Sequence, residues 1–265
     1  MKNYLLCADD FLFTKNISLG IINLLSKDKI NATSAMVIFS KNKSFGTLLK
    51  KKIKKKQIIG LHLVLTNYKP LHKFKYIKKF PGLLKLILNI LIRKIKVNEI
   101  EIEIKSQIVE FKKIFGHLPT YIDGHHHVHQ MPFISDILID VINKIYPKQN
   151  KPLVRNTHLK LILILKNNIE LLKTIMLSLF GLYLKNKLKK NNIPTNNYFF
   201  GIYDFLKMND YKKNFLLFEK FKKNGSIFMT HPGFVDKEIL KLDTLTNQRF
   251  EEYKALSGDF NFYDS

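Results

Sequence analysis

The fold is decided by the stretch YLLCADD at residues 4–10, an apolar run of strand length that ends in two aspartates. Directly after it, Ile17, Ile21, Leu24 and Leu25 recur at the spacing of one helix face. This strand-then-helix unit recurs along the chain and predicts an α/β fold with a parallel sheet, either a barrel or a doubly wound sheet. Further strands are expected near residues 33–39, 58–65, 118–128, 153–155, 198–201 and 226–230, and helices near 43–56, 98–115, 133–145, 211–221 and after 243.

Composition narrows the class of protein. The 265 residues are 46% hydrophobic and include one cysteine, which excludes a disordered chain and a disulfide-built scaffold. No Pro/Gly/Ser-rich linker divides the chain, so one domain over residues 1–265 is expected. The N-terminus does not read as a signal peptide, and the longest uncharged apolar run, residues 174–184, is shorter than the roughly 18 residues of a membrane span. We therefore expect a cytoplasmic protein.

The charge is strongly basic. Lysine and arginine number 45 against 21 aspartates and glutamates, which gives a formal net charge of +24. Such a charge is compatible with nucleic acid or an anionic membrane surface as a partner. A compositional bias toward Lys, Ile and Asn accounts for it equally simply, because net charge bears on solubility rather than on a site. The sequence contains no motif that reads nucleic acid, so no specific nucleic-acid partner is expected.

Polar residues interrupt the apolar strands where those strands end. Asp9 and Asp10 close the first run, His62 lies inside the third, DGHHHVH at residues 123–129 closes the fourth, and His231 follows the last. In parallel α/β folds the carboxyl ends of the strands form the active-site face, so these residues are expected to meet there. Each alone has a simpler interpretation, since a lone histidine can be a core residue and paired aspartates can cap the following helix.

The histidine-rich run is more specific. Period-2 alternation in a strand places Asp123, His125, His127 and His129 on one face. Imidazoles buried in a row with nothing to bind would lose the free energy of their solvation, which favours a bound ligand. The alternative is a surface histidine tract that binds metal adventitiously. One carboxylate and two imidazoles make a three-ligand set typical of hydrolytic metal sites, and a second carboxylate can take a proton from water. The spacing therefore predicts a metal-dependent hydrolase.

Five motifs resemble the YdjC-like (also called ChbG-like) carbohydrate deacetylases. They are ADDF at residues 8–11, TSAMV at 33–37, GLHLVLT at 60–66, PTYIDGHHHVH at 119–129 and HPGFVD at 231–236. The resemblance implies a single irregular, TIM-like (β/α) barrel with fewer than eight strands. It also implies an enzyme that removes N-acetyl groups from amino sugars.

The resemblance further implies roles for individual residues. One divalent metal ion, Mg²⁺ by family resemblance with Zn²⁺ or Mn²⁺ as alternatives, would be bound by Asp10, His62 and His125. Asp9 would be the general base and His231 the general acid. His127 and Arg155 are candidates for orienting the sugar or the ligands; the simpler interpretation of Arg155 is an ordinary surface or salt-bridged arginine.

Three positions depart from the family pattern. Glycine usually follows the ADDF motif where this chain has Leu12, cysteine commonly precedes the last His-Pro pair where it has Thr230, and histidine often stands at Tyr121. None of these removes a proposed ligand. The substrate pocket is nevertheless expected to differ from that of members that act on soluble chitin oligosaccharides.

Apolar and basic residues are mixed in a way that the fold does not require. Residues 50–56 form a dense basic run, and two helical insertions near residues 83–97 and 159–190 combine many leucines and isoleucines with lysine. Such helices suit a membrane interface, a homodimer interface or a buried barrel position. In the first case the protein is peripheral at the inner face of the membrane and its substrate is a lipid-linked acetamido sugar.

Three other functions stay open at this point. One is a non-catalytic basic protein that binds nucleic acid or membrane, and another is a degenerate barrel that keeps the ligands but acts as a scaffold. The third is a metal-dependent phosphoesterase on a similar barrel, although such enzymes usually bring more ligands and often two metals.

Overall fold

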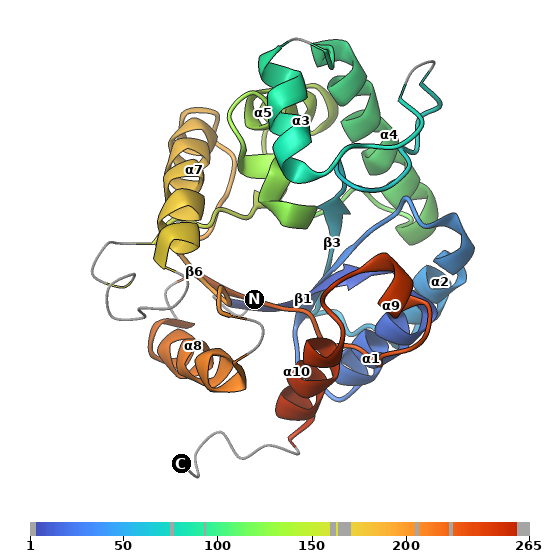
Figure 1. Ribbon diagram of the computed structural model, residues 1–265, viewed down its shortest axis with the longest axis vertical. Coiled ribbons are helices and arrows are strands. Elements are labelled where there is room, and N and C mark those ends of the chain that lie inside the picture. The colour runs from blue at the N-terminus through green and yellow to red at the C-terminus, as the bar shows by residue number, and fades with distance from the viewer. Residues whose placement is uncertain are drawn as a thin grey trace.

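The computed structural model describes residues 4–74, 77–92, 94–159, 163, 171–204, 207–222 and 225–258 (Figure 1). Seven strands in this part of the chain form one parallel sheet. They are β1 (Tyr4–Phe11), β2 (Ala32–Ala35), β3 (Ile58–Leu63), β4 (Tyr121–Gly124), β5 (Leu153–Val154), β6 (Tyr198–Phe200) and β7 (Ser226–Thr230). Each apolar run that the sequence marks as a strand therefore contributes to the sheet.

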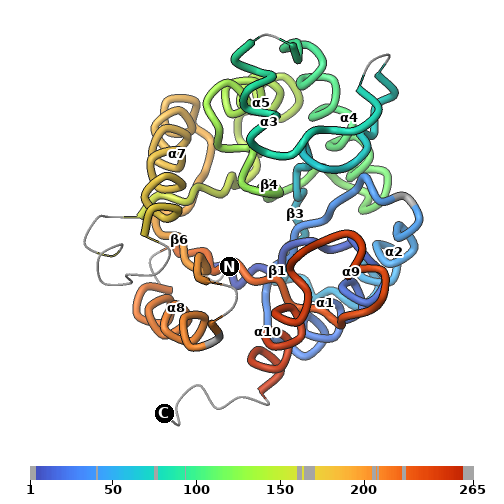
Figure 2. Tube along the Cα trace, viewed as in Figure 1, coloured from blue at the N-terminus to red at the C-terminus, as the bar shows by residue number. Residues whose placement is uncertain are grey.

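Helices connect the strands and lie around the outside of the sheet (Figures 1 and 2). They are α1 (Lys15–Ser26), α2 (Ser44–Lys52), α3 (Leu83–Leu91), α4 (Val97–Phe115), α5 (Ile134–Ile145), α7 (Leu171–Lys190), α8 (Met208–Phe221), α9 (Ile239–Leu242) and α10 (Asn247–Ser257), with two 3₁₀ helices, η1 (Ser40–Asn42) and η2 (His125–Gln130). None of the described helices is long and apolar enough to pass through a bilayer. Arg93 and most of the predicted insertion between residues 159 and 171 lie outside the described residues.

The sheet is a curled, incomplete barrel. Its strand order is β5-β4-β3-β2-β1-β7-β6, and every neighbouring pair is parallel. A parallel bridge joins Val154 of the edge strand β5 to Thr195, which precedes the other edge strand β6, and Val154 N donates to Pro194 O at 2.9 Å. The α/β class, the parallel sheet and the strand number below eight in the described part of the chain agree with the expected irregular barrel, but no continuous ladder within that part closes it.

Three expected strands are shorter than predicted. Those expected at residues 33–39 and 58–65 end at Ala35 and Leu63, and the fourth is shortened most. The run at residues 118–128 is a strand only over Tyr121–Gly124 and continues as the 3₁₀ helix His125–Gln130. His126 and His127 have φ angles of 53° and 55°, in the left-handed region, so the chain turns out of the strand. The predicted common strand face for the histidines of this run is therefore wrong, because period-2 alternation ends with the strand.

Alternate strand residues face two different cores. On β1, Leu6 and Ala8 pack with helix residues in the larger core, whereas Leu5 and Cys7 belong to a smaller core inside the curl. The smaller core is formed by Leu5, Cys7, Ala32, Tyr121, Leu177, Phe199, Ile202, Ile227 and Met229. The inward-facing positions are apolar along the strands and become polar only at their carboxyl ends, which is where the candidate site lies.

Candidate metal and catalytic site

The polar residues at the strand ends continue the inward-facing rows. In the sheet register His62 lies opposite Asp123, and Ala8 lies opposite both Thr33 and Thr230. The residues that follow Ala8, Thr33 and Thr230 are Asp9, Ser34 and His231. They therefore lie next to one another at the ends of three neighbouring strands. The inward-facing residues gathered in this way are Asp9, Ser34, His62, Asp123, Arg155 and His231.

Strand β1 brings two adjacent aspartates into the site, although neighbours in a regular strand point to opposite faces. The pairing of β1 with β2 shifts register between Ala8 and Phe11, and Asp10 has a φ of 65°. Through this bulge both carboxylates line the same cavity. The aspartates are not the helix cap, because Thr14 Oγ1 accepts from the Ile17 N–H at the start of α1.

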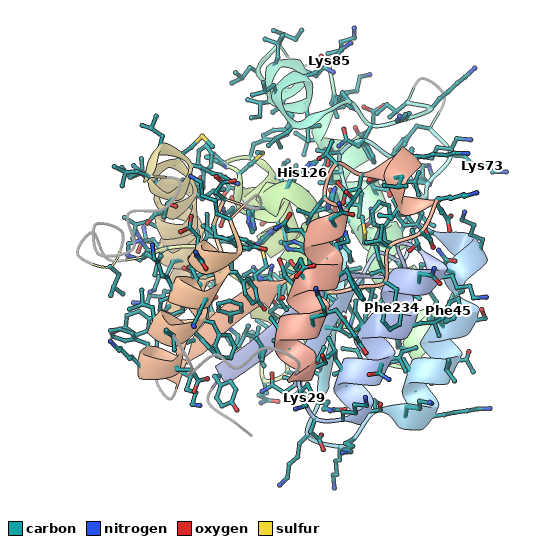
Figure 3. All side chains as sticks on the ribbon, turned by 60° about the horizontal axis from the view of Figure 1, so that its bottom comes forward. Lys29, Phe45, Lys73, Lys85, His126 and Phe234 are labelled. Carbon is teal, nitrogen blue, oxygen red and sulfur yellow. The ribbon has the colours of Figure 1, made fainter. Side chains whose placement is uncertain are left out.

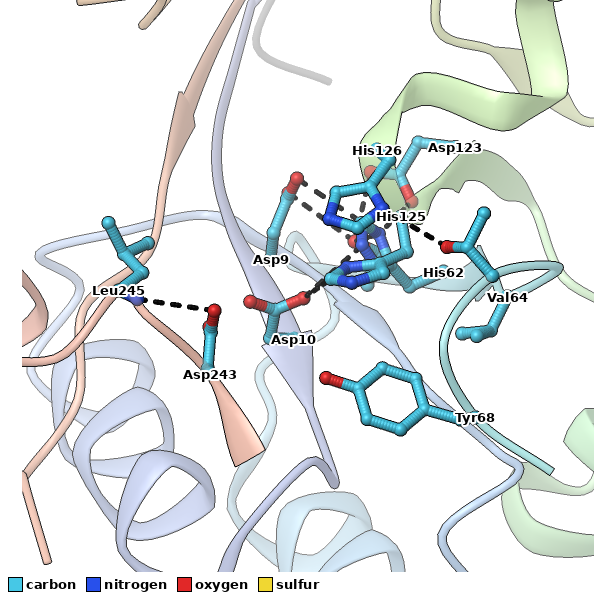
Figure 4. A network of polar contacts seen from close by, with 12 residues as sticks. Asp9, Asp10, His62, Val64, Tyr68, Asp123, His125, His126, Asp243 and Leu245 are labelled. Atoms are coloured by element: carbon cyan, nitrogen blue, oxygen red, sulfur yellow. Dashed lines mark hydrogen bonds and ion pairs between the residues drawn. The ribbon is translucent and has the colours of Figure 1, made fainter. Parts of the chain in front are cut away.

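Asp10, His62 and His125 form a set that fits a divalent metal ion (Figure 4). One ligand atom from each lies within 4.8 Å of the others. Asp10 Oδ1 is 3.3 Å from His62 Nε2 and 3.6 Å from His125 Nδ1. Ligands about 2.1 Å from a common ion lie roughly 3.0–3.4 Å apart in octahedral or tetrahedral geometry, close to these separations. Among the described residues, the buried Asp10 Oδ1 has no well-formed hydrogen bond and instead faces these two ring nitrogens, as expected of an oxygen that binds a cation.

The ring of His62 is oriented by a hydrogen-bond network. Its Nδ1 lies 2.7 Å from Asp123 Oδ1, and Ser34 Oγ donates to Asp123 Oδ2 at 2.9 Å. This network assigns the Nδ1–H as a donor to Asp123, which leaves the Nε2 lone pair facing Asp10. A carboxylate behind a histidine ligand is the arrangement that fixes the ring and raises its basicity in metal sites.

The electrostatic environment of His62 favours a positive charge. Burial lowers the pKa of the imidazole, but Asp123, Asp10 and Asp9 outweigh burial and raise the pKa to about 10. A metal ion competes with the proton for the same Nε2 atom. The carboxylates around His62 therefore favour a cation at this position, whether a proton or a metal.

Arg155 orients Asp9 from within the core. Its Nη1 and Nη2 donate to the two carboxylate oxygens of Asp9, both at 2.6 Å, and Nη2 also lies 2.7 Å from Asp123 Oδ2. Its Nε donates to the Tyr121 hydroxyl at 2.6 Å, and its guanidinium lies 5.6 Å from the ring centroid of Phe199. Such a fork restricts the carboxylate of Asp9 to one plane. The arginine is fully buried, so the prediction of a surface residue is wrong, whereas the alternative of a salt-bridged arginine agrees with its pairs to Asp9 and Asp123.

A second arginine reaches the site from the far end of the chain. Arg249 of α10 donates through Nη2 to Asp10 Oδ2 at 2.6 Å and to Asp243 Oδ2 at 2.7 Å. Burial raises the pKa of Asp10, but Arg249 and the two histidines His125 and His62 outweigh burial and hold that pKa well below its usual range. One oxygen of Asp10 is thus held by Arg249 and the other faces the histidines.

His231 lies on the cavity wall directly after β7. Its backbone N–H donates to the buried carboxylate of Glu252, which also accepts from Thr230 Oγ1 and from the Tyr203 hydroxyl. Thr230, a departure from the family pattern, thus supplies a hydroxyl that ties the end of β7 to α10.

The remaining histidines of the run take different positions. His127 lines the cavity beside Phe199, with ring centroids 5.7 Å apart, and burial together with Arg155 lowers its pKa well below the usual value. His126 packs against His125 with ring centroids 4.1 Å apart. His129 is fully buried behind the cavity, where its Nε2 lies 2.9 Å from Arg155 O. Only His125 of this run joins the metal-capable set.

The second ligand-capable group of the described residues, Cys7, Asp9 and Asp123, is engaged otherwise. Arg155 already pairs with both carboxylates, and burial together with Asp9 raises the pKa of the Cys7 thiol well above its usual value. A protonated thiol is a poor metal ligand. This group is therefore part of the support for Asp9 rather than a second metal site.

The site opens into a cavity of about 290 Å³. Asp9, Asp10, His62, His125, His127 and His231 all line it, whereas Arg155 lies behind the wall. The rest of its wall has an apolar part, formed by Leu83, Met176, Leu177, Ile202, Met229 and Leu245, and further polar residues, His126, Lys173, Asp243, Thr244 and Arg249. A few convergent polar groups on a largely apolar wall are typical of small-molecule sites.

Three buried partners of the site were not predicted from the sequence. Ser34 stands within a quoted motif but has no distinguishing chemistry of its own, and Arg249 and Glu252 occur in an ordinary polar helix. Arg249 pairs with a residue 239 positions earlier. No local pattern carries that information.

Comparison with known proteins agrees with the motifs. The family model described as YdjC-like protein matches residues 4–260. A carbohydrate deacetylase of Clostridium beijerinckii is 27% identical over 253 residues, which cover 95% of this chain and 89% of that protein. Chitooligosaccharide deacetylases of Escherichia fergusonii and Serratia marcescens are each 33% identical over 49% of this chain and 52% of their own length.

The fold also has a solved counterpart. A crystal structure from Enterococcus faecalis V583, of a protein named for a proposed role in cellobiose-phosphate cleavage, has a TM-score of 0.70. It is 18% identical in sequence, and the match covers 96% of this chain and 90% of the other. At this identity the likeness concerns the fold alone. Because the family model spans nearly the whole sequence, the chain belongs to the YdjC-like protein family.

Proposed function

We propose that this protein is a metal-dependent hydrolase that removes the N-acetyl group from an amino sugar, releasing acetate and the free amine. The observation that carries the proposal is the set of Asp10, His62 and His125 beside Asp9 in one cavity. The deacetylase names of the relatives support the reaction class. The domain that performs it is proposed to be residues 1–265 as one unit.

The residues of this chain have distinct proposed tasks. Asp9, held in plane by Arg155, accepts the proton of the attacking water. His231, which directly follows the strand β7 that pairs with β1, donates a proton to the departing amine nitrogen. The chemistry that a divalent cation supplies at such a site is polarisation of the acetyl carbonyl and a lower pKa for a nearby water.

The choice of metal is part of the proposal. Two imidazoles and one carboxylate are compatible with Zn²⁺ and Mn²⁺, and the resemblance to the family favours Mg²⁺.

His127 lines the cavity with a lowered pKa, so its neutral ring is available to accept a hydrogen bond from the sugar or to donate one to it. Arg155 acts through Asp9 and does not touch the cavity.

The test is acetate release from a panel of N-acetylated sugars in the presence of Mg²⁺, Zn²⁺ or Mn²⁺. We expect Asp9→Asn and His125→Ala each to lower the rate by at least about 100-fold. His117→Ala changes an exposed histidine before β4 and is the matched control, with a rate within about twofold of the wild type.

A second measurement tests metal binding independently of catalytic activity. Calorimetric titration with Mn²⁺ should show binding by the wild type and by His117→Ala, and a loss of at least about tenfold in affinity for His125→Ala. Acetate release that survives in His125→Ala would overturn the metal assignment. Release of phosphate from a sugar phosphate without any acetate release would favour the phosphoesterase instead.

A further inference from the structure

Helix α7, which borders the cavity, carries large apolar side chains on its outside. It buries Thr174 and Ser178 along with Leu177, whereas Leu172 is 85% exposed and Leu179 is 62% exposed. Surface helices normally bury their leucines and expose their small polar residues. Over its first half, α7 therefore has a partly inverted pattern.

Helix α3 has the same property. Leu86 is its buried residue, while Leu84 is 82% exposed and Leu88 and Leu91 are exposed as well. Isolated exposed leucines are common on proteins, but a group of them on neighbouring turns marks an interaction surface. We refer to the exposed residues of both helices as the α3–α7 rim, formed by Leu84, Leu88, Leu91, Leu172, Met176 and Leu179.

The rim is continuous with the cavity. Leu83, the first residue of α3, lines the cavity, and so does Met176 of α7, which is also 49% exposed. In Figure 1, α7 lies at the upper left of the molecule and α3 at its top. A molecule that enters or leaves the cavity between these helices thus passes apolar side chains.

The charged residues of α3 and α7 indicate which kind of partner binds the rim. The sequences of α3 and α7 contain Lys85, Lys173 and four lysines near the end of α7, but no aspartate or glutamate. Lys187 of α7 pairs with Asp136 of α5 at 3.0 Å. In a twofold dimer through this rim, the lysines of α3 and α7 would nevertheless face one another with no carboxylate from either helix between them. An anionic phospholipid surface offers both the apolar layer for the leucines and the phosphates for the lysines.

We propose that the α3–α7 rim docks on an anionic phospholipid bilayer with the cavity facing the headgroups. The acetamido sugar is then one carried by a lipid, and this second statement rests on the proposed deacetylase function. The leucines enter the headgroup boundary, and the lysines provide the preference for anionic lipid.

Vesicle flotation tests the docking. Vesicles of phosphatidylcholine with about 30% phosphatidylglycerol should bind the protein at least about tenfold more tightly than pure phosphatidylcholine. Leu84→Ser/Leu172→Ser should lose at least about tenfold in binding, and Lys85→Glu about fivefold. Val109→Ser on the outer face of α4 and Lys29→Glu, at the end of the molecule opposite Lys85 (Figure 3), are the matched controls and should bind like the wild type.

Two results would overturn the docking surface. One is a wild type that ignores anionic vesicles at low salt, and the other is a double variant that floats as well as the wild type. Sedimentation of the same variants identifies the competing occupant: a dimer that the double variant dissociates, without vesicle binding, assigns the rim to a second copy of this chain.

Acetate release tests the substrate class. The double variant should keep the wild-type rate on a soluble N-acetylated sugar and lose at least about tenfold on the same sugar carried by a lipid in anionic vesicles. Equal losses on both substrates, or no preference of the wild type for the lipid-linked form, would contradict it. If the wild type releases acetate from neither, the proposed function fails, while flotation still decides the docking.

Discussion

At the scale of single residues, His129 shows how a site is supported from behind. A Cβ atom at Gly124 would lie 2.9 Å from His129 Nδ1, so the ring fills the space that the glycine leaves. Its Nε2 lies 2.9 Å from Arg155 O. The imidazole thus fixes the backbone at the end of β4 and at the residue that orients Asp9, without lining the cavity.

We expect acid to destabilise the protein through His129. Burial lowers its pKa to about 4 and outweighs the opposing effect of Asp123, against 6.5 as the ordinary value. Between these pH values His129 binds a proton in the unfolded chain but not in the folded state. The full stability is therefore present above about pH 6.5 and is lost as pH falls to about 4, by about 3 kcal/mol.

Urea unfolding of the wild type and of His129→Gln, at about pH 7 and about pH 4.5, checks this prediction. The wild type should lose about 2–3 kcal/mol more than the variant on acidification. Equal losses in the two proteins would mean that His129 does not resist protonation.

At the scale of elements, the loop after β1 has a left-handed backbone conformation that the sequence does not predict. Leu12 has a φ of 73° and is fully buried, at the position where the family pattern has glycine. Its N–H donates to Ser18 Oγ at 3.1 Å, and Asn42 Nδ2 donates to Leu12 O at 2.9 Å. Packing and these two hydrogen bonds offset the cost of the left-handed backbone, about 1 kcal/mol for a residue other than glycine.

Strands β3 and β4 make a second close contact. A Cβ atom at Gly60 would lie 2.2 Å from Tyr121 Cδ1 and 2.8 Å from Tyr121 O. Because the Tyr121 hydroxyl accepts from Arg155, we expect Gly60→Ala to displace both residues and to lower the free energy of unfolding by about 3 kcal/mol.

Calorimetric melting of Gly60→Ala measures that loss. Gly82→Ala is the control, because its added Cβ would meet only Asn67 Oδ1, at 3.4 Å. We expect the control to melt within a few degrees of the wild type. A Gly60→Ala protein with an unchanged melting temperature would show that β4 can move away from β3 at little cost.

At the scale of the whole molecule, charge and chemistry are separate. The proposed site uses aspartates, histidines and two buried arginines, while the excess that produces the net charge of +24 consists largely of lysines elsewhere in the sequence. Like charges spread over a surface repel one another, and salt screens this repulsion.

We therefore expect salt to stabilise the protein. Raising the NaCl concentration from about 10 mM to about 150 mM shortens the Debye length from roughly 30 Å to roughly 8 Å and should raise the melting temperature by a few degrees. Differential scanning calorimetry at both concentrations measures the change. A lower melting temperature in salt would mean that attractive ion pairs outweigh the net repulsion.

The sequence by itself determined the α/β class, the strands and the family. It determined the class and the strands because apolar runs of strand length are a local pattern, which arises since the strands of a parallel sheet are buried on both faces. The resemblance to the family implied Asp10, His62 and His125 as ligands, and the structure places their side chains together, although their roles stay predictions.

Only the tertiary structure decided the rest. The left-handed turn after Gly124, the parallel bridge at β5 and the reach of Arg249 to Asp10 depend on contacts between distant residues. Such contacts have no local signature, because the hydrogen bonds that stabilise an unusual backbone or a buried charge come from elsewhere in the chain. The exposure of the leucines on α3 and α7 also depends on tertiary structure. The sequence shows that each helix is apolar, but only packing decides which of its faces is left exposed.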